Sequence, residues 1–288
     1  MFAERLAGDA ARIQAHFDHV LGGLDALPVV QAMGYATEGG KRLRGFLVLE
    51  SARLHDVAED RAIWPACAIE ALHAYSLVHD DLPCMDDDDL RRGRPTVHVK
   101  WDDGTAVLAG DALQALAFEL AAQEACGDAA VRADLALSLA RASGARGMVL
   151  GQALDIAAEA AAEPLTLDEI TRLQAGKTGA LIEWAACAGA RLAGADIAPL
   201  ADYARALGLA FQIADDILDE EGDAEKAGKR LRKDAEAGKA TFVSLLGLEG
   251  ARARAGALVE EAEAALEPYG ARADALREAA RFVISRES

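Results

Sequence analysis

Aromatic residues, prolines and cysteines are all scarce in this chain of 288 residues. Aromatic residues make up 5% of it, and its 7 prolines do not gather into a linker that would mark a domain boundary. Its 4 cysteines show no close pairing, which argues against a zinc site or a disulfide framework and favours free thiols in a reducing cytoplasm. No apolar run reaches the roughly 18 residues that a membrane-spanning helix needs, and no signal peptide is recognisable. We therefore expect a cytoplasmic protein that does not insert into a membrane.

Runs of alternating β-branched residues, which would indicate strands, are also missing. Instead, 52% of the residues are hydrophobic, and nearly every segment repeats its apolar positions at the period of a helix. The sequence therefore predicts an all-α protein, a single-domain bundle of about ten or more helices around a central cavity. The expected helices cover residues 1–21, 63–78, 105–123, 129–162, 167–192 and 207–220, with two more between 244 and 286.

A strongly acidic balance gives the chain a net charge of −18. Nucleic-acid-binding proteins usually carry a basic face, so this balance argues against a nucleic acid as partner. Solubility explains the acidity of most of the surface. Two clusters of Asp need a different explanation, because each of them directly follows an apolar helical segment.

The first acidic cluster begins where the apolar segment 63–78 ends. The chain there reads DDLPCMDDDDLRRGRPT over residues 80–96. The C-terminal end of a helix is the negative end of its dipole, so a row of carboxylates at this place is costly unless cations neutralise it. A hard metal ion and the three arginines of the same stretch are the cations that this cluster calls for.

The second cluster closes the predicted helix 207–220. Asp215 and Asp219 are four residues apart and so share one face of that helix, with Asp216 beside them. Two helices that each end in paired Asp predict a cavity with carboxylates on opposing walls. Carboxylate oxygens without a Cys or His cluster favour Mg²⁺, which completes its shell with water and phosphate oxygens. We therefore expect a diphosphate as the substrate.

Gly39 and Gly40 precede a group of cations, Lys41, Arg42 and Arg44, at the start of a predicted helix. Flexible glycines with exposed N–H groups beside cations suit an anionic oxygen ligand. A solvated basic turn is the more ordinary interpretation of such residues by themselves. The residues alone leave both interpretations open.

Several motifs, taken in order, resemble those of the trans-isoprenyl diphosphate synthases, specifically the bacterial farnesyl diphosphate synthase type. The resemblance extends from about residue 35 to the end of the chain. Besides the two Asp-rich motifs, the matching stretches are GGKRLR (39–44), HAYSLVHDD (73–81), LAGDALQ (108–114), GQALD (151–155), KTGAL (177–181) and FQIADD (211–216). One such motif would be weak evidence, whereas their shared order and spacing are strong evidence.

The resemblance implies the isoprenoid synthase fold and a head-to-tail prenyl transfer between isopentenyl diphosphate and an allylic diphosphate. It also implies a homodimer and Mg²⁺, about three ions per active site, with Mn²⁺ able to substitute. The implied metal ligands are Asp80, Asp81, Asp86, Asp215, Asp216 and Asp219.

The resemblance also assigns substrate contacts. Isopentenyl diphosphate is expected to contact Lys41, Arg44, His73 and Arg92. The allylic diphosphate is expected to contact Arg91, Lys177, Lys229 and Lys239. Thr178 and Gln212 are expected to line the cavity beside the reacting carbon, with Asp155 close by.

Two stretches near these contacts carry further expectations. The polar segment 221–242, which includes Lys229 and Lys239, is expected to form a surface loop that closes over the site. Gly45 stands where the bacterial members of the resembling family usually carry Pro, so we expect a looser helix start there.

Tyr75 bears on the length of the product. It lies five residues before Asp80, about 7.5 Å along a helix axis. Without the resemblance, an aromatic residue at this place would simply be part of the core. In the resembling family the growing chain points down this helix, so a bulky Tyr75 followed by a small Ser76 limits its length. This pattern, with the longer first Asp motif, favours fifteen-carbon farnesyl diphosphate.

Other functions fit the residues less well. A geranylgeranyl or geranyl diphosphate synthase of the same family stays open, because only Tyr75 and its neighbours address product length. A terpene cyclase needs no second diphosphate site of the GGKRLR type. A non-catalytic partner subunit of a prenyl synthase usually lacks motif residues that are all present here. A Ca²⁺-binding EF-hand loop beginning at Asp86 would need Gly and Glu where Arg91 and Val97 stand.

Overall fold

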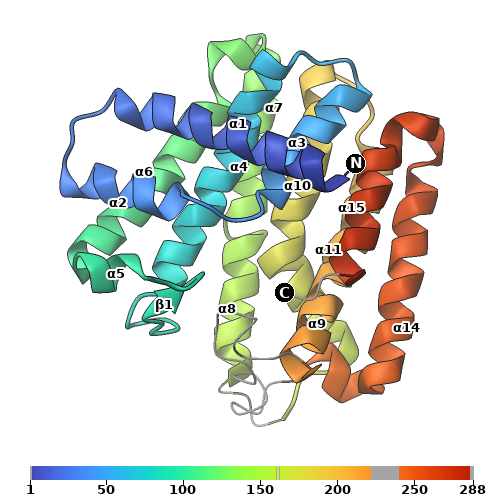
Figure 1. Cartoon of the computed structure of the whole chain (residues 1–288). Coiled ribbons are helices and arrows are strands. Elements are labelled where there is room, and N and C mark those ends of the chain that lie inside the picture. Colours follow the sequence, from blue (N-terminus) through green and yellow to red (C-terminus); the bar gives the residue numbers. More distant parts are fainter. Residues whose placement is uncertain (1, 160, 162, 222–239, 286–288) are drawn as a thin grey trace. The chain divides into compact units, whose positions relative to one another are not determined.

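The computed structural model of the chain describes residues 2–159, 161, 163–221 and 240–285 (Figure 1). All regular secondary structure in these residues is helical, apart from one hairpin of two short strands. The predicted all-α fold class is therefore confirmed.

The chain folds into two compact units. One comprises residues 1–139 and 188–195, and the other comprises residues 140–187 and 196–288. The prediction of a single domain is not tested by this division and stays a prediction.

The first unit contains the N-terminal helices and is built around α4. Its elements are α1 (Phe2–Gly22), α2 (Pro28–Thr37), α3 (Leu43–Leu54), α4 (Glu59–Asp80), β1 (Leu90–Arg91), β2 (Arg94–Pro95), α5 (Val97–Lys100), α6 (Asp103–Ala121), the 3₁₀ turn η1 (Glu124–Cys126) and most of α7 (Ala129–Ser143). α4 contacts α1, α2, α3 and α6. The apolar segment 63–78 lies within α4 and is mostly buried, which confirms that this segment is a central helix.

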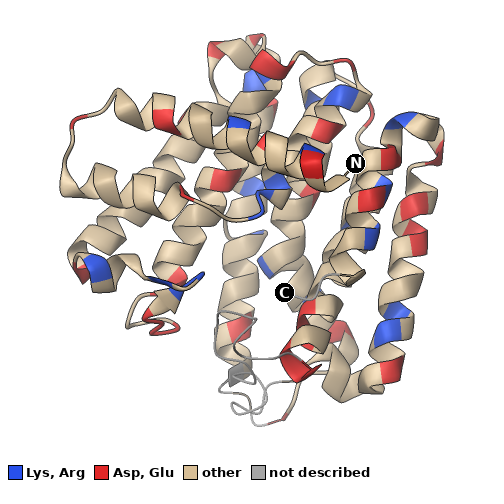
Figure 2. Ribbon diagram, viewed as in Figure 1, with Lys and Arg blue, Asp and Glu red and all other residues tan. Residues whose placement is uncertain are grey.

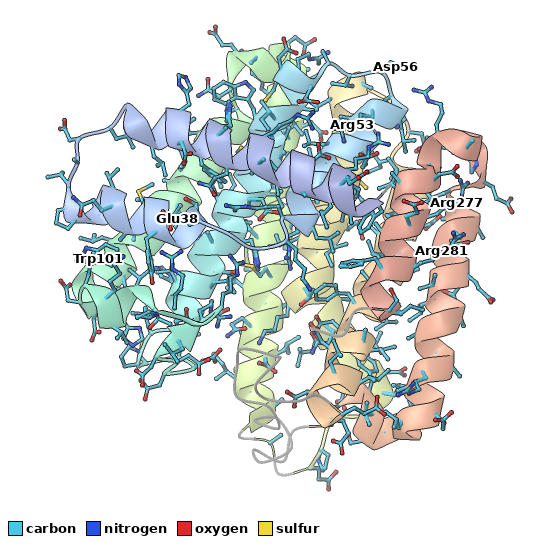
Figure 3. The ribbon with its side chains drawn as sticks, viewed as in Figure 1. Glu38, Arg53, Asp56, Trp101, Arg277 and Arg281 are labelled. Atoms are coloured by element: carbon cyan, nitrogen blue, oxygen red, sulfur yellow. The ribbon has the colours of Figure 1, made fainter. Side chains whose placement is uncertain are left out.

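A buried carboxylate joins α1 to α3 in the first unit. Asp9 is fully buried, and both of its oxygens accept hydrogen bonds from Arg53 (labelled in Figure 3), at 2.7 and 2.6 Å. Arg12 donates a further bond to Asp9 at 2.9 Å, but its side chain is half exposed. The neighbouring Glu50 is also buried, and burial raises the pKa of its carboxyl group. Arg53 is therefore the cation that makes burial of Asp9 tolerable.

The second unit is built around α11. Its elements are the end of α7, α8 (Met148–Glu159), α9 (Leu167–Gln174), the π-helical turn η2 (Ala175–Gly179), α10 (Ala180–Ala193), whose last residues belong to the first unit, α11 (Ala198–Glu221), α14 (Phe242–Ala265), the 3₁₀ segment η3 (Glu267–Ala273) and α15 (Asp274–Ser285). α11 contacts α9, η2, α14 and α15. Arg281 of α15 pairs with Glu263 of α14 at 2.6 Å, and these two helices run side by side (Figures 1 and 3).

Two of the predicted helices are interrupted. The sequence predicts one helix over residues 129–162, but the structure has α7 and α8 within this range, with a break at residues 144–147; residues 160 and 162 lie outside the described part of the chain. Gly144 and Gly147 stand at the ends of this break, and glycine raises the free energy of the helical state. The predicted helix 167–192 is broken into α9 and α10 by the π turn η2. The two helices expected after residue 244 are present as α14 and α15.

Acidic and basic residues are interspersed along the helices of each unit (Figure 2). Of the helices that the structure describes, none combines the length and the apolar character that a membrane crossing requires.

The Asp9–Arg53 pair makes a prediction about stability. Asp9→Ala is expected to lower the free energy of unfolding by about 3 kcal/mol, because it removes one partner of a buried ion pair. Arg12→Ala removes a half-exposed contact to the same carboxylate and an exposed pair with Glu59, and is expected to cost less than about 1 kcal/mol. Urea denaturation of both variants measures the difference. Equal losses would show that the buried pair is not the main link between α1 and α3.

Candidate active site

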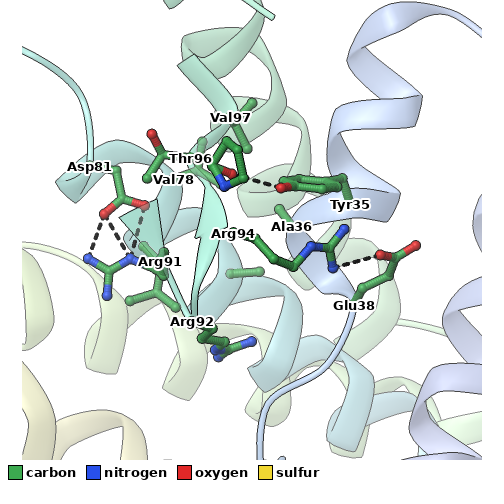
Figure 4. Close-up of a pocket in the computed structure, with 13 residues that line it drawn as sticks. Tyr35, Ala36, Glu38, Val78, Asp81, Arg91, Arg92, Arg94, Thr96 and Val97 are labelled. Carbon is green, nitrogen blue, oxygen red and sulfur yellow. Dashed lines mark hydrogen bonds and ion pairs between the residues drawn. The ribbon is translucent and has the colours of Figure 1, made fainter. Parts of the chain in front are cut away.

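Asp81, directly after α4, is bound by an arginine from β1. The Arg91 guanidinium donates from Nε to both Asp81 oxygens, at 2.7 and 2.9 Å, and also from Nη2 (Figure 4). Asp81 is only 3% exposed. Burial raises the pKa of its carboxyl group, and the hydrogen bonds and charge of Arg91 oppose that rise. This pair fixes the direction of the Arg91 side chain.

Asp80 and Asp86 are brought together by the backbone. Asp80 is the last residue of α4, and the Asp86 N–H donates to the Asp80 carbonyl at 2.9 Å. Asp87, the next residue, has a positive φ of 51°, which turns the chain toward the hairpin. The six-residue separation in the sequence thus becomes a tight turn, with Asp86 exposed on it.

Gly40 and Arg92 bring the two predicted phosphate-binding segments into contact. Arg92 lies in the turn between β1 and β2, and a Cβ on Gly40 would lie 2.7–2.8 Å from three atoms of its guanidinium. Gly40 also has a φ of +80°, a conformation that favours glycine. The backbone conformation favours glycine at this position, and a side chain would also displace the guanidinium.

His73 of α4 lies in a field of arginines. Burial lowers the pKa of His73 well below its usual range, and the positive charges of Arg44, Arg92, Arg91 and Arg42 lower it further. The imidazole is therefore neutral at pH 7. A neutral His among cations retains a donor for an anionic ligand without adding charge of its own.

The start of α3 is not loose, although Gly45 replaces a family proline. The Gly45 N–H donates to Glu70 Oε1 of α4 at 2.8 Å, a bond that proline could not make. Glu70 also pairs with the buried Arg42 at 3.6 Å. Local sequence patterns do not predict the Glu70–Arg42 pair, because the two residues are far apart in the sequence.

Tyr75 is buried one turn before the end of α4. Burial raises the pKa of its hydroxyl, and a side-chain hydrogen bond with Gln114 of α6 opposes the rise. Its ring also meets His79 edge to face, with centroids 5.3 Å apart. The hydroxyl of the neighbouring Ser76 donates to the His73 carbonyl at 2.9 Å. Tyr75 is therefore fixed at both its ring and its hydroxyl.

In the second unit, the second Asp motif lies at the end of α11. Asp215, Asp216 and Asp219 are all partly buried there. Asp216 Oδ2 accepts a hydrogen bond of 2.7 Å from the backbone N–H of Phe242, the first residue of α14. A carboxylate at this place stabilises the positive end of the α14 dipole.

Lys177 and Thr178 both lie in the π turn η2, a rare structure that is frequent at functional sites. Gly151 of α8 packs directly against this turn, because a Cβ on it would lie 2.0 Å from the Lys177 backbone nitrogen. The Lys177 ammonium donates to Asp155 Oδ2 of α8 at 2.7 Å. The sequence placed Asp155 near the cavity but did not predict this ion pair.

Four other predicted site residues lie apart from the contacts described so far or outside the described residues. Gln212 of α11 donates from its side chain to the Gln174 side chain at 2.7 Å. Lys41 is exposed between α2 and α3. Lys229 and Lys239, with the predicted closing loop, lie outside the described residues.

The carboxylates present suit a hard cation that shares its shell with substrate oxygens. Within the described residues, no three or more His, Cys, Asp or Glu side chains converge to hold a metal by themselves. Mg²⁺ commonly binds through one or two carboxylates, water and phosphate oxygens, so Asp80 and Asp86 fit its donor preference.

Comparison with known proteins gives consistent relatives. A family model described as Polyprenyl synthetase matches residues 28–275. Farnesyl diphosphate synthase of Escherichia coli is 46% identical over 269 residues, covering 90% of this chain and 89% of that protein. Geranylgeranyl pyrophosphate synthase 9 of Arabidopsis thaliana is 43% identical over 263 residues, covering 88% and 72%. The crystal structure of an FPP/GFPP synthase from Zymomonas mobilis has a TM-score of 0.88 and 47% identity, covering 98% and 99%. The predicted family resemblance and fold are confirmed.

The Gly40–Arg92 contact predicts a selective loss of anion binding. Gly40→Ala is expected to weaken the binding of inorganic diphosphate, measured by calorimetry without Mg²⁺, by about tenfold, because the new methyl group displaces the Arg92 guanidinium. Gly39→Ala is the matched control: φ is positive at both glycines, but no atom lies within 4 Å of a Cβ on Gly39. A similar loss in both variants would assign the effect to backbone strain.

The depressed pKa of His73 predicts a stability change with pH. The unfolded chain binds a proton at His73 more readily than the folded chain, so stability is lost as the pH falls below the unfolded value of about 6.5. Between pH 6 and 5, wild type is expected to lose up to about 1.4 kcal/mol per pH unit more than His73→Gln. The other histidines are common to both proteins and cancel. Parallel stability curves for the two proteins would contradict the assignment.

Proposed function

The chain belongs to the polyprenyl synthetase family, and we propose that within it the protein is a farnesyl diphosphate synthase. Membership makes it a prenyltransferase. The proposed reaction joins isopentenyl diphosphate head to tail with dimethylallyl or geranyl diphosphate. The observation that carries the proposal is the pairing, in one unit, of the Asp80–Asp86 turn with a separate cationic site at Gly40, His73 and Arg92. Two different diphosphates need these two kinds of site.

The two Asp motifs divide the work between metal and protein. Members of this family typically use Mg²⁺, and bound Mg²⁺ supplies charge neutralisation to the leaving diphosphate. We assign its ligands to Asp80 and Asp86 in the first unit and to Asp215 and Asp219 in the second. Asp81 and Asp216, which are also predicted as ligands, accept hydrogen bonds from Arg91 and from the start of α14 and so orient these two elements as well.

The allylic diphosphate is the leaving group. Arg91 and Lys177, with Lys229 and Lys239, donate hydrogen bonds to its oxygens and stabilise the charge that develops as the C–O bond breaks. The electron pair of that bond leaves with the diphosphate, and an allylic cation remains. Lys177 must first exchange its bond to Asp155 for one to the substrate. Thr178 and Gln212 line the space beside the cation and help to exclude water.

Isopentenyl diphosphate is the nucleophile. Lys41, Arg44 and Arg92 bind its diphosphate, and neutral His73 donates a hydrogen bond to it. Its double bond attacks the allylic cation and forms the new C–C bond. A proton is then lost to the departing diphosphate, which restores a double bond. No protein nucleophile is required, so all of these side chains bind or orient the substrates.

Product length is the part of the proposal that depends on Tyr75. The geranylgeranyl synthase relative is nearly as similar as the farnesyl synthase relative, at 43% against 46% identity. A twenty-carbon product is therefore the second candidate. Burial of Tyr75 and its hydrogen bond to Gln114 favour the shorter product, since a fixed ring limits the growing chain. A homodimer, a cytoplasmic location and replacement of Mg²⁺ by Mn²⁺ also remain proposals from the family.

Product analysis tests this function directly. With Mg²⁺, isopentenyl diphosphate and geranyl diphosphate, the protein is expected to form a fifteen-carbon product, sized by mass spectrometry. Tyr75→Ala is expected to give twenty carbons or more, because the floor of the cavity is removed, whereas Tyr75→Phe keeps the ring and the shorter product. A twenty-carbon product from wild type would refute the role of Tyr75 and leave the transfer reaction standing.

Asp80→Ala is the activity control for the same assay. Loss of one metal ligand is expected to lower kcat about 100-fold or more. No condensation by the folded wild-type protein would instead favour a non-catalytic partner subunit.

A further inference from the structure

The hairpin that carries Arg91 and Arg92 is too small to be stable without external contacts. Its strands are two residues long, with Leu90 paired to Pro95 and Arg91 to Arg94. The turn between them has positive φ at both central residues, 53° at Arg92 and 72° at Gly93. This conformation suits a tight hairpin turn but is strained for arginine. Even longer two-stranded hairpins are only marginally stable in water. The position of Arg92 therefore depends on the contacts between this hairpin and the rest of the protein.

On the side of the hairpin that faces α2 and α4, close packing of side chains does not hold the hairpin in place. A cavity of about 60 Å³ lies behind the hairpin, between α2, α4 and β2 (Figure 4). Ala74, Leu77 and Val78 of α4 form its apolar wall. Because this space is not filled by side chains, the hairpin could shift into it without meeting a close-packed core.

Tyr35 makes the contacts that bridge this gap. Its hydroxyl donates to the Pro95 carbonyl at 2.8 Å. The Arg94 guanidinium lies 4.0 Å from the centre of its ring, and the Lys100 ammonium lies 3.7 Å from it. One side chain of α2 thus binds β2 through a hydrogen bond and a cation–π contact and binds the following α5 through a second cation–π contact.

Glu38 adds an ion pair to the same strand but contributes less. Its carboxylate is 2.8 Å from Arg94 Nη1, and the two side chains are 54% and 45% exposed. Exposed pairs of this kind contribute little to stability. Trp101, labelled with Glu38 in Figure 3, meets the Tyr35 ring edge to face at 5.4 Å. Tyr35 is therefore the main contact from α2 to the hairpin.

The same short segment also carries the other half of the anion site. Gly40, which lies against the Arg92 guanidinium, follows Tyr35 by only five residues, and Lys41 comes next. The contacts of Tyr35 with β2 therefore link the segment that carries Lys41 to the hairpin that carries Arg92. Arg91 does not need these contacts, because Asp81 of α4 holds it separately.

We propose that Tyr35 is a positioning residue that holds Arg92 in place for the diphosphate of the non-allylic substrate. This inference rests on the proposed function, which assigns Arg92 to isopentenyl diphosphate and Arg91 to the allylic substrate. Loss of Tyr35 therefore weakens one substrate selectively. A residue that only stabilised the fold would affect both substrates alike.

Steady-state kinetics of Tyr35→Leu and Tyr35→Phe test the proposal. Tyr35→Leu is expected to raise KM for isopentenyl diphosphate about tenfold, with kcat and the allylic KM changed by less than about twofold. Tyr35→Phe keeps the ring and loses only the hydrogen bond to Pro95, so a rise of about threefold is expected. It also serves if Tyr35→Leu fails to fold. Equal rises in both KM values would overturn the proposal.

A double-mutant cycle tests whether Tyr35 acts through Arg92. In an Arg92→Lys background, Tyr35→Leu is expected to add no further increase in KM, because the group that it positions is already altered. Effects that multiply would refute the assignment.

Failure of the proposed function is distinguishable from failure of this inference. If wild type forms no product, the four proteins of the double-mutant cycle (wild type, Tyr35→Leu, Arg92→Lys and the double variant) are titrated with inorganic diphosphate in the absence of Mg²⁺. Positioning would still be supported if Tyr35→Leu weakens diphosphate binding in the wild-type background but has no further effect in the Arg92→Lys background. Unchanged binding would overturn it.

Discussion

Negative charge at the end of an apolar helix must be compensated, and the rest of this structure depends on that constraint. In each Asp-rich motif, the second Asp is compensated by the protein. Asp81 is bound by Arg91, and Asp216 is bound by the first backbone N–H of α14. Each bond also fixes the element that supplies it. The hydrogen bonds that compensate the charge of each second Asp therefore also orient neighbouring groups toward the substrate.

Close backbone approach is the second requirement of both units. Gly40 lets the Arg92 guanidinium lie against the chain, and Gly151 lets α8 lie against the π turn that carries Lys177. In each case the absence of a side chain sets the position of a cation. Close approach at these glycines therefore acts together with carboxylate partners, Asp81 for Arg91 and Asp155 for Lys177, in placing the cations. Asp155 neutralises Lys177 in the structure described, so a substrate must compete with it.

Local sequence patterns failed where one segment depends on a distant one. The spacing of apolar residues did not reveal the break between α7 and α8, because apolar residues on both sides of the break recur at the period of a helix. Gly45 suggested a loose helix start, but its N–H is held by Glu70. No local pattern predicts a role for Tyr35, since its contacts are with residues about 60 positions away. Each of these depends on a partner that local spacing does not identify.

The sequence by itself determined the all-α class, the burial of segment 63–78, the acidic motifs and the family, because these follow from composition, period and ordered motifs. Only the tertiary structure decided that Asp81 is committed to Arg91, that His73 is neutral among four arginines, and that Gly40 packs under Arg92. The physical reason is distance. Periodicity is a property of neighbouring residues, whereas charge compensation and steric contact depend on which groups folding brings within a few ångströms.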